Sequence, residues 1–157
     1  MTHPLIGRIA TPFYGTYSAS KWALEAIVEC YRTELSDFGI ESCIIEPGAM
    51  PTAFFDGLVA PSDVAREAEY GDFAAVPAMS NAGLAQMLAA TPMQRPERIA
   101  ETVTALLDMP FGQKPFRTVV DHVGVGPEIE RYNDVLHDVT RTVLTNFGIA
   151  EMLDLNA

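Results

Sequence analysis

Apolar residues recur every three or four positions between residues 24 and 35, and this spacing predicts a helix over about 15–38. The stripe consists of Leu24, Ile27, Val28, Tyr31 and Leu35, which a period of 3.6 residues places on one face. Gly39 provides a C-terminal stop for the helix. The β-prone run that follows, over residues 40–45, is closed by Pro47-Gly48 and predicts a strand.

A long helix, a tight glycine turn, a strand and a Pro-Gly loop form the second half of a βαβ unit. This order implies a parallel sheet and an α/β fold class. Open sheets of this kind bind ligands in the loops at the carboxyl ends of their strands. Thr52 lies in such a loop, four residues past Gly48. The loop after residue 45 is therefore a candidate ligand site.

Two more helices are predicted further along the chain. Arg95-Pro96-Glu97 is a helix start signal for a helix over roughly 96–109. A second apolar stripe predicts a C-terminal helix over about 127–147 that stops near Gly148. The stripe consists of Ile129, Tyr132, Val135, Leu136, Val139, Val143, Leu144 and Phe147. We interpret it as a packing face, with contact across a subunit boundary as an alternative.

Tyr17 and Lys21 form the most informative pair for chemistry. They lie four residues apart at the start of the first helix, so a helix places both on one face. A neighbouring ammonium favours the phenolate, and the pKa of the phenol would fall from about 10 toward neutrality. Proton transfer to or from a substrate oxygen at neutral pH needs such a group. The alternative is an unremarkable surface Tyr and Lys near a helix N-terminus.

The residues around this pair resemble the C-terminal half of a short-chain dehydrogenase/reductase. The matching segment runs from Gly7 to Thr52, in three parts: Tyr17-Ser18-Ala19-Ser20-Lys21, the helix, and Gly39-Ile40-x-Ser42 followed by Pro47-Gly48-x-x-x-Thr52. The resemblance continues more loosely through an irregular substrate loop over about 51–93, the last sheet helix at about 96–109 and a last strand at 117–121. It implies a single domain over 1–157, a partial Rossmann-type doubly wound parallel sheet whose N-terminal half is missing.

The resemblance also implies roles for individual residues. Tyr17 would be the general acid/base, and Lys21 would lower the pKa of Tyr17 and bind the ribose hydroxyls of the cofactor. Pro47, Gly48 and Thr52 would line the nicotinamide end of bound NAD or NADP. The substrate would be a small-molecule carbonyl or alcohol. From the residues alone, Pro47-Gly48 is an ordinary turn and Thr52 is a helix cap.

Several features of the family are absent. No glycine-rich G-x-x-x-G-x-G turn occurs, and Gly124-Val125-Gly126 lacks the third glycine. Pro4 stands at the position of the family's catalytic Ser, and the family's active-site Asn has no counterpart. We therefore expect these residues alone to bind the cofactor more weakly than millimolar and not to be an efficient catalyst. Whether the chain is an enzyme stays open: it is part of an oxidoreductase, or a non-catalytic remnant that acts as a binding or oligomerisation module.

Two strands make a poor independent sheet, and the unpaired edge at residues 43–45 would be exposed. We therefore expect a homo-oligomer or a complementing polypeptide. The segment 53–93 has many aromatic and Met side chains, interpreted either as a mobile lid over an apolar pocket or as core packing. These side chains are Phe54, Phe55, Phe73, Met79, Met87 and Met93.

Composition narrows the remaining classes. The 157 residues carry a formal net charge of -11, which argues against nucleic acid and anionic membrane surfaces as partners. No apolar run is long enough for a membrane span, and the N-terminus lacks a signal-peptide pattern. Cys30 and Cys43 are interpreted as reduced, buried thiols of a cytoplasmic protein. The three His residues lack metal-ligand spacing, so no metal site is predicted.

Overall fold

The computed structural model describes residues 8–59 and 61–155, so Pro4, at the position of the family's catalytic Ser, lies outside the described residues. The described part contains two strands and five α-helices, joined by short 3₁₀ turns. The strands are β1 (Ile44–Pro47) and β2 (Arg117–Val120); the helices are α1 (Gly15–Glu34), α2 (Val64–Ala68), α3 (Val76–Ala89), α4 (Glu97–Asp108) and α5 (Gly126–Phe147).

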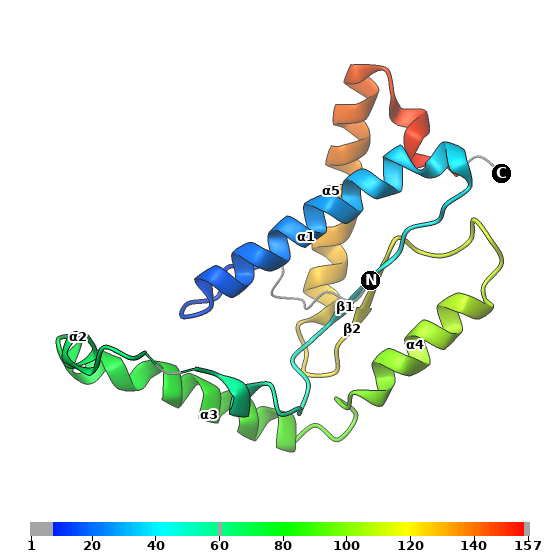
Figure 1. Cartoon of the computed structure of the whole chain (residues 1–157). Coiled ribbons are helices and arrows are strands. Elements are labelled where there is room, and N and C mark those ends of the chain that lie inside the picture. Colours follow the sequence, from blue (N-terminus) through cyan, green and yellow to red (C-terminus); the bar gives the residue numbers. More distant parts are fainter. Residues whose placement is uncertain (1–7, 60, 156–157) are drawn as a thin grey trace.

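The two strands form a parallel sheet, in which Ile44 pairs with Arg117 and Pro47 pairs with Val120. The long connection through α2, α3 and α4 allows the parallel direction. Figure 1 shows α1 and α5 crossing each other beside the sheet, while α4 lies apart from them. The segment α2–α3 extends away from the sheet as an arm (Figure 1).

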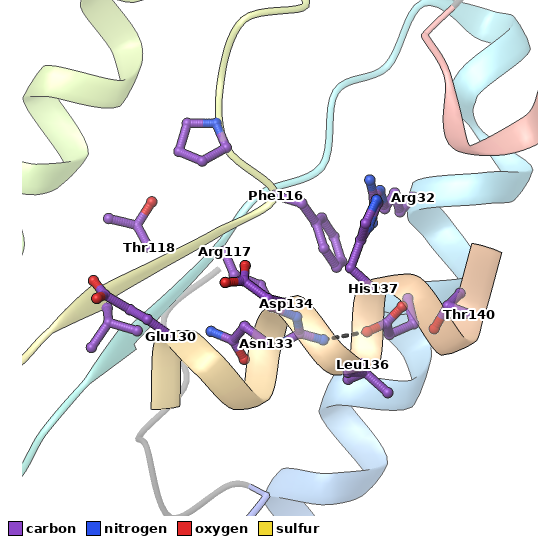
Figure 2. Close-up of a pocket in the computed structure, with 13 residues that line it drawn as sticks. Arg32, Phe116, Arg117, Thr118, Glu130, Asn133, Asp134, Leu136, His137 and Thr140 are labelled. Atoms are coloured by element: carbon purple, nitrogen blue, oxygen red, sulfur yellow. Dashed lines mark hydrogen bonds and ion pairs between the residues drawn. The ribbon is translucent and has the colours of Figure 1, made fainter. Parts of the chain in front are cut away.

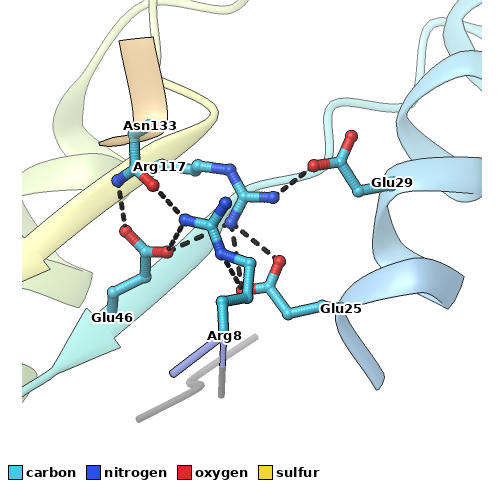
Figure 3. Close-up of polar contacts among 6 residues, drawn as sticks. All are labelled: Arg8, Glu25, Glu29, Glu46, Arg117 and Asn133. Carbon is cyan, nitrogen blue, oxygen red and sulfur yellow. Dashed lines mark hydrogen bonds and ion pairs between the residues drawn. The ribbon is translucent and has the colours of Figure 1, made fainter. Parts of the chain in front are cut away.

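The two faces of the sheet differ in chemistry because side chains alternate along a strand. On the α4 side, Ile45 and Val120 form an apolar cluster with Met50, Leu106 and the half-buried Ile99. On the side of α1 and α5, the charged side chains of Glu46 and Arg117, which are 3% and 8% exposed, point at the helices (Figure 3). The helix with the strongest apolar stripe, α4, therefore covers the apolar face, and the charged face needs polar partners.

The carboxylate of Asp121 binds backbone amides at the N-terminus of the helix α5. Asp121 follows β2 directly, and its Oδ2 accepts from the backbone amides of Gly124, Val125 and Gly126 at 2.9–3.0 Å. The amides of Val125 and Gly126 belong to the donors that a helix N-terminus leaves unpaired. The helix ends at Gly148, whose φ of 74° is left-handed and suits glycine.

Two expectations from the sequence are wrong, and of the two interpretations of the large apolar side chains in residues 53–93, core packing is not supported. The segment 51–93 is not irregular, because it contains the 14-residue helix α3. Most of its large apolar side chains do not pack as core: Met79 is 70% exposed and Phe73 is 55% exposed. Cys30 is exposed rather than buried, since it lies on the outer face of α1.

The two predicted apolar stripes are only partly buried. On α1, Val28 is buried while Ile27 and Tyr31 are exposed. On α5, Ile129 is buried and the valines at 135, 139 and 143 are exposed. Within the described residues, no helix is both long and apolar enough to cross a membrane.

Candidate active site

A pocket of about 280 Å³ opens at the carboxyl end of β1. It lies between the start of α1, the loop after β1 and the helix α3. None of the side chains that line it is charged, and most of its surface is apolar. The lining residues are Thr11, Tyr14, Tyr17, Pro47, Gly48, Ala49, Met50, Thr52, Phe54, Phe55, Ser80, Asn81 and Leu84.

This pocket brings together four of the five site residues predicted from the sequence: Tyr17, Pro47, Gly48 and Thr52. The fifth, Lys21, lies one turn further along α1, with its Nζ 5.4 Å from the centroid of the Tyr17 ring. The cation therefore lies near the ring of the phenol. Tyr17 also contacts Phe54, with ring centroids 5.6 Å apart.

The pKa of Tyr17 differs from the sequence expectation in its direction. Partial burial raises the pKa of the Tyr17 phenol above its ordinary value, because it reduces the solvation of the phenolate by water. The expected lowering by Lys21 does not prevail in this structure. At neutral pH Tyr17 therefore holds its proton, and a protonated phenol is a proton donor rather than a base.

Thr52 lies at the pocket, where the resemblance implies that its hydroxyl would meet the cofactor. Its side chain lines the pocket, and its Oγ1 also accepts a long contact of 3.4 Å from the backbone amide of Phe54. That contact is a weak local turn and not the expected helix cap, because the 3₁₀ turn Phe55–Gly57 has no side-chain cap. The hydroxyl proton of Thr52 is not used in this contact, so it can still donate to a molecule in the pocket.

A buried cluster of charges holds α1 against the sheet (Figure 3). The Arg117 guanidinium donates to Glu25 at 2.7 and 3.0 Å and to Glu46 at 3.1 Å, and it also pairs with Glu29. Arg8 donates to Glu46 at 2.8 Å. Glu25 lies two turns after Tyr17 on α1, and Glu46 directly precedes Pro47. The cluster therefore fixes the helix that carries Tyr17 relative to the strand that ends at the pocket.

The pKa of Arg117 is raised, in keeping with its close carboxylate partners. Burial disfavours the charge of the guanidinium, but the carboxylates of Glu25 and Glu29 outweigh that cost and raise the pKa. Asn133 of α5 completes the cluster through a hydrogen bond from its Nδ2 to Glu46 at 2.6 Å. Charged groups in such a position are stable only when each has close partners.

The loop after β1 is fixed by Gln94, which is 1% exposed. Its Nε2 donates to the carbonyl of Ala49 at 2.7 Å, and its Oε1 accepts from the amide of His122 at 2.7 Å. Gly48 lies so close to Asp121 that an added Cβ would be 2.3 Å from the Asp121 Oδ1 atom. Only glycine fits at this point, which is a packing reason for the Pro47-Gly48 turn.

Sequence reasoning missed several lining residues. Tyr14 precedes Tyr17 by three residues, a helical spacing that could have indicated a shared face. Its hydroxyl donates to Asn81 Oδ1 at 2.7 Å. Asn81 lies 67 positions further along the chain in a segment without a clear apolar period, so no local signal predicted it.

A second pocket, of about 400 Å³, lies between α1, β2 and α5 (Figure 2). It is larger, but it contains none of the predicted site residues. Figure 2 shows Arg32 and His137 near Phe116 in this pocket, and the Arg32 guanidinium lies 4.3 Å from the Phe116 ring centroid. Burial lowers the pKa of Arg32. We therefore place the candidate active site in the smaller pocket at the end of β1.

Comparisons with known proteins agree with the resemblance seen in the sequence. Residues 2–62 match the family model for short chain dehydrogenases. The chain is 47% identical over 58 residues to the uncharacterized oxidoreductase YbbO of Escherichia coli. This alignment covers 37% of the chain and 22% of YbbO. The chain is also 35% identical over 66 residues to the NADPH-dependent 3-dehydrocapnine reductase of Ornithobacterium rhinotracheale. This alignment covers 42% of the chain and 23% of the reductase.

A solved structure extends the similarity to most of the chain. A short-chain dehydrogenase from Streptomyces avermitilis matches with a TM-score of 0.50 and 25% identity, over 94% of this chain and 48% of that one. The chain thus spans about half the length of that structure, and the curated relatives match over less than a quarter of theirs. Residues 2–62 are thus similar in sequence to short-chain dehydrogenases, and the chain has a Rossmann-like α/β fold of the kind found in that family.

The described residues fit one end of the family's dinucleotide cofactor. Around the pocket lie a phenol, an ammonium one turn away and a hydroxyl at Thr52, which suit a nicotinamide and its ribose. The pyrophosphate has no such match in the described part of the chain. The glycine-rich turn before α5 already gives its amides to Asp121, so this turn cannot hold a phosphate.

Proposed function

We propose that the chain contributes the nicotinamide end of an NAD(P)-dependent oxidoreductase that interconverts a carbonyl and an alcohol. Tyr17 is the general acid/base, and Lys21, Pro47, Gly48 and Thr52 hold the nicotinamide and its ribose. One observation carries this proposal: the Tyr17 phenol lines the pocket at the end of β1, with the Lys21 ammonium 5.4 Å from its ring centroid.

The proton step follows from the state of Tyr17. In the direction of reduction, the protonated phenol donates its proton to the carbonyl oxygen as negative charge develops there. When bound, the nicotinamide supplies the hydride for reduction and accepts it for oxidation. The resulting phenolate is stabilised by the nearby Lys21 ammonium. In the reverse direction the phenolate removes the proton of an alcohol, and this direction needs a higher pH because burial raises the pKa of Tyr17.

The surroundings of the pocket support this assignment. The charge cluster holds α1 in place on one side, and Gln94 holds the loop after β1 on the other. A site whose reacting groups are held by buried contacts is favourable for catalysis because little reorganisation is needed. Nothing in the comparisons gives better support to the alternative of a non-catalytic binding or oligomerisation module.

Binding of reduced nicotinamide mononucleotide tests the proposal. This probe lacks the adenosine half of NADPH, for which the described residues provide no site. We therefore expect the two compounds to bind with dissociation constants that agree within about threefold and lie above the millimolar range. The measurement is a titration by NMR of protein labelled at the tyrosine Cζ atoms, with the Tyr17 resonance assigned by Tyr17→Phe.

Matched variants complete this experiment. Lys21→Met should weaken binding of both compounds by about three- to tenfold, the effect of losing a polar contact. Tyr31→Phe, an exposed change on the same helix, should have no effect. If the mononucleotide leaves the Tyr17 resonance unchanged while NADPH binds, the nicotinamide lies elsewhere and the proposal is wrong. Micromolar binding of NADPH would contradict the view that only one end of the cofactor is held.

A further inference from the structure

The pocket has a polar group that the proposed chemistry does not use, formed by Tyr14 and Asn81. Tyr14 lies directly before α1, three residues from Tyr17, and Asn81 lies on α3. The Tyr14 hydroxyl donates to Asn81 Oδ1 at 2.7 Å. Both side chains line the same pocket as Tyr17. The pocket therefore has a second polar position besides its acid/base residue.

The direction of this hydrogen bond determines what a ligand would meet. The hydroxyl proton of Tyr14 is spent on Asn81, so Tyr14 offers only lone pairs. The Asn81 amide uses its oxygen in the same bond, and among residues 8–59 and 61–155 no group accepts from its Nδ2. Two N–H donors of Asn81 are thus available. A ligand oxygen that accepts a hydrogen bond would satisfy them.

The rest of the lining restricts the ligand further. The pocket contains no Asp, Glu, Lys, Arg or His side chain, so a charged group inside it would lose its hydration without gaining an opposite charge. Met50, Phe54, Phe55 and Leu84 provide an apolar and partly aromatic wall. The volume of about 280 Å³ lies near the lower end of the usual range of small-molecule sites.

The backbone before Tyr14 is held in an unusual conformation. Phe13 has a φ of 72°, a left-handed value that a side chain other than glycine rarely adopts. Its ring contacts Phe73 of the α2–α3 arm, with centroids 5.9 Å apart. The Phe13–Phe73 contact and the Tyr14–Asn81 bond are thus neighbouring links between the start of α1 and the arm. Together they hold Asn81 at the pocket.

We propose that Tyr14 and Asn81 are specificity-determining residues, which select a compact, neutral, largely apolar ketone or secondary alcohol with a second oxygen that accepts a hydrogen bond from Asn81. This inference deepens the proposed function and rests on it for the reacting carbonyl. The second oxygen is a keto, ether or ester oxygen. Substrates whose bound part carries a carboxylate, a phosphate or an ammonium are rejected.

Three aryl ketones of similar size test this selection by binding alone, in ligand-observed NMR titrations of the full chain. Para-methoxyacetophenone has the second acceptor, para-ethylacetophenone lacks it, and para-acetylbenzoate carries a negative charge. We expect the methoxy compound to bind about three- to tenfold more tightly than the ethyl compound. The benzoate should bind at least about tenfold more weakly than the methoxy compound.

Substitutions at the two residues give different expected results. Asn81→Leu should abolish the preference for the methoxy over the ethyl compound. Asn81→Asp replaces the donors by acceptors and should instead favour para-hydroxyacetophenone, which has a donor. Tyr14→Phe removes the hydrogen bond that orients the Asn81 amide, so the amide can rotate and exchange the positions of its oxygen and nitrogen. This variant should reduce the preference for the methoxy compound without abolishing binding. Asn146→Leu, an exposed change at the far end of α5, is the control and should retain the full preference.

The outcomes separate this inference from the proposed function. Equal binding of the methoxy and ethyl compounds, an unchanged preference in Asn81→Leu with a wild-type circular dichroism spectrum, or binding of none of the ketones would overturn the inference. Tyr17→Phe should weaken the methoxy and ethyl compounds equally, since it removes the donor to the carbonyl they share. If the preference is present but Tyr17→Phe changes neither affinity, the selectivity stands and the role of Tyr17 is wrong.

Discussion

Replacing Arg117 by Met should strongly destabilise the protein, because it leaves the carboxylates of Glu25, Glu29 and Glu46 with Arg8 as the one remaining cation of the cluster among residues 8–59 and 61–155. The Arg117 and Glu46 side chains are 8% and 3% exposed, so water cannot take over the lost contacts. Breaking a buried ion pair by removing one partner costs about 3–5 kcal/mol. That is a large part of the ~5–15 kcal/mol by which a domain is usually stable.

Urea unfolding followed by circular dichroism measures this loss. With a denaturant dependence of about 2 kcal/mol per molar, a loss of ~4 kcal/mol lowers the midpoint by roughly 2 M. Arg66→Met is the matched control. Arg66 also forms an ion pair, with Glu69 at 2.7 Å, but the two side chains are 68% and 62% exposed. Its loss should change the stability by no more than about 0.5 kcal/mol.

A double variant shows whether the loss comes from unbalanced charge. Arg117→Met combined with Glu46→Met removes one cation and one carboxylate, and Arg8 still faces Glu25, whose Oε1 lies 3.6 Å from the Arg8 Nε. We expect the double variant to recover at least half of the lost stability. Equal midpoints for Arg117→Met and Arg66→Met, or a double variant less stable than Arg117→Met, would refute the reasoning.

Three further predictions concern the pocket and its supports. Gly48→Ala should destabilise the protein by about 1–3 kcal/mol, since the added Cβ would lie 2.3 Å from Asp121 Oδ1. The control Gly83→Ala on α3, where an added Cβ meets no atom within 4 Å, should stabilise the protein by about 0.5–1 kcal/mol. Equal effects of the two substitutions would contradict the close packing at Gly48. Gln94→Leu should lower the free energy of unfolding by about 2–4 kcal/mol, because the carbonyl of Ala49 and the amide of His122 both lose their partner. The exposed change Gln113→Leu is the control. A smaller destabilisation by Gln94→Leu than by Gln113→Leu would argue against a role of Gln94 in fixing the loop. In ultraviolet difference titrations against Tyr17→Phe, Tyr17 should ionise above the ordinary tyrosine pKa, since burial raises its pKa. The contribution of Tyr17 to stability is fully present below the unfolded pKa of about 10 and is lost as the pH rises through the folded pKa. Ionisation of Tyr17 below a pH of about 10 would show that the Lys21 charge outweighs burial.

The sequence was sufficient for the elements whose patterns are local. The stripe from Leu24 to Leu35 predicted a helix, and the structure has α1 there, ending at Glu34. The spacing of Tyr17 and Lys21 follows from the same period. The parallel direction of the two strands follows from the long connection between them. The resemblance to short-chain dehydrogenases was recognised from these same residues, and the comparisons confirm it over residues 2–62.

Features that depend on distant contacts could not be predicted. The apolar residues of the helix α3 are spread around its circumference between a few polar ones, so it lacks the one-sided stripe that signals a helix. Arg117 and Glu25 lie 92 positions apart, and no local pattern links them. The same holds for Tyr14 and Asn81. The predicted direction of the Tyr17 pKa shift was wrong, because the spacing of residues reveals a neighbouring charge but does not reveal burial.

The structure of the chain with reduced nicotinamide mononucleotide and para-methoxyacetophenone bound is the most direct test of the role of Tyr17. The account predicts the ketone oxygen within about 2.6–3.2 Å of the Tyr17 hydroxyl, and the ribose hydroxyls beside the Lys21 ammonium. A ketone bound in the pocket with its oxygen turned away from Tyr17, or a nicotinamide bound away from the end of β1, would contradict it.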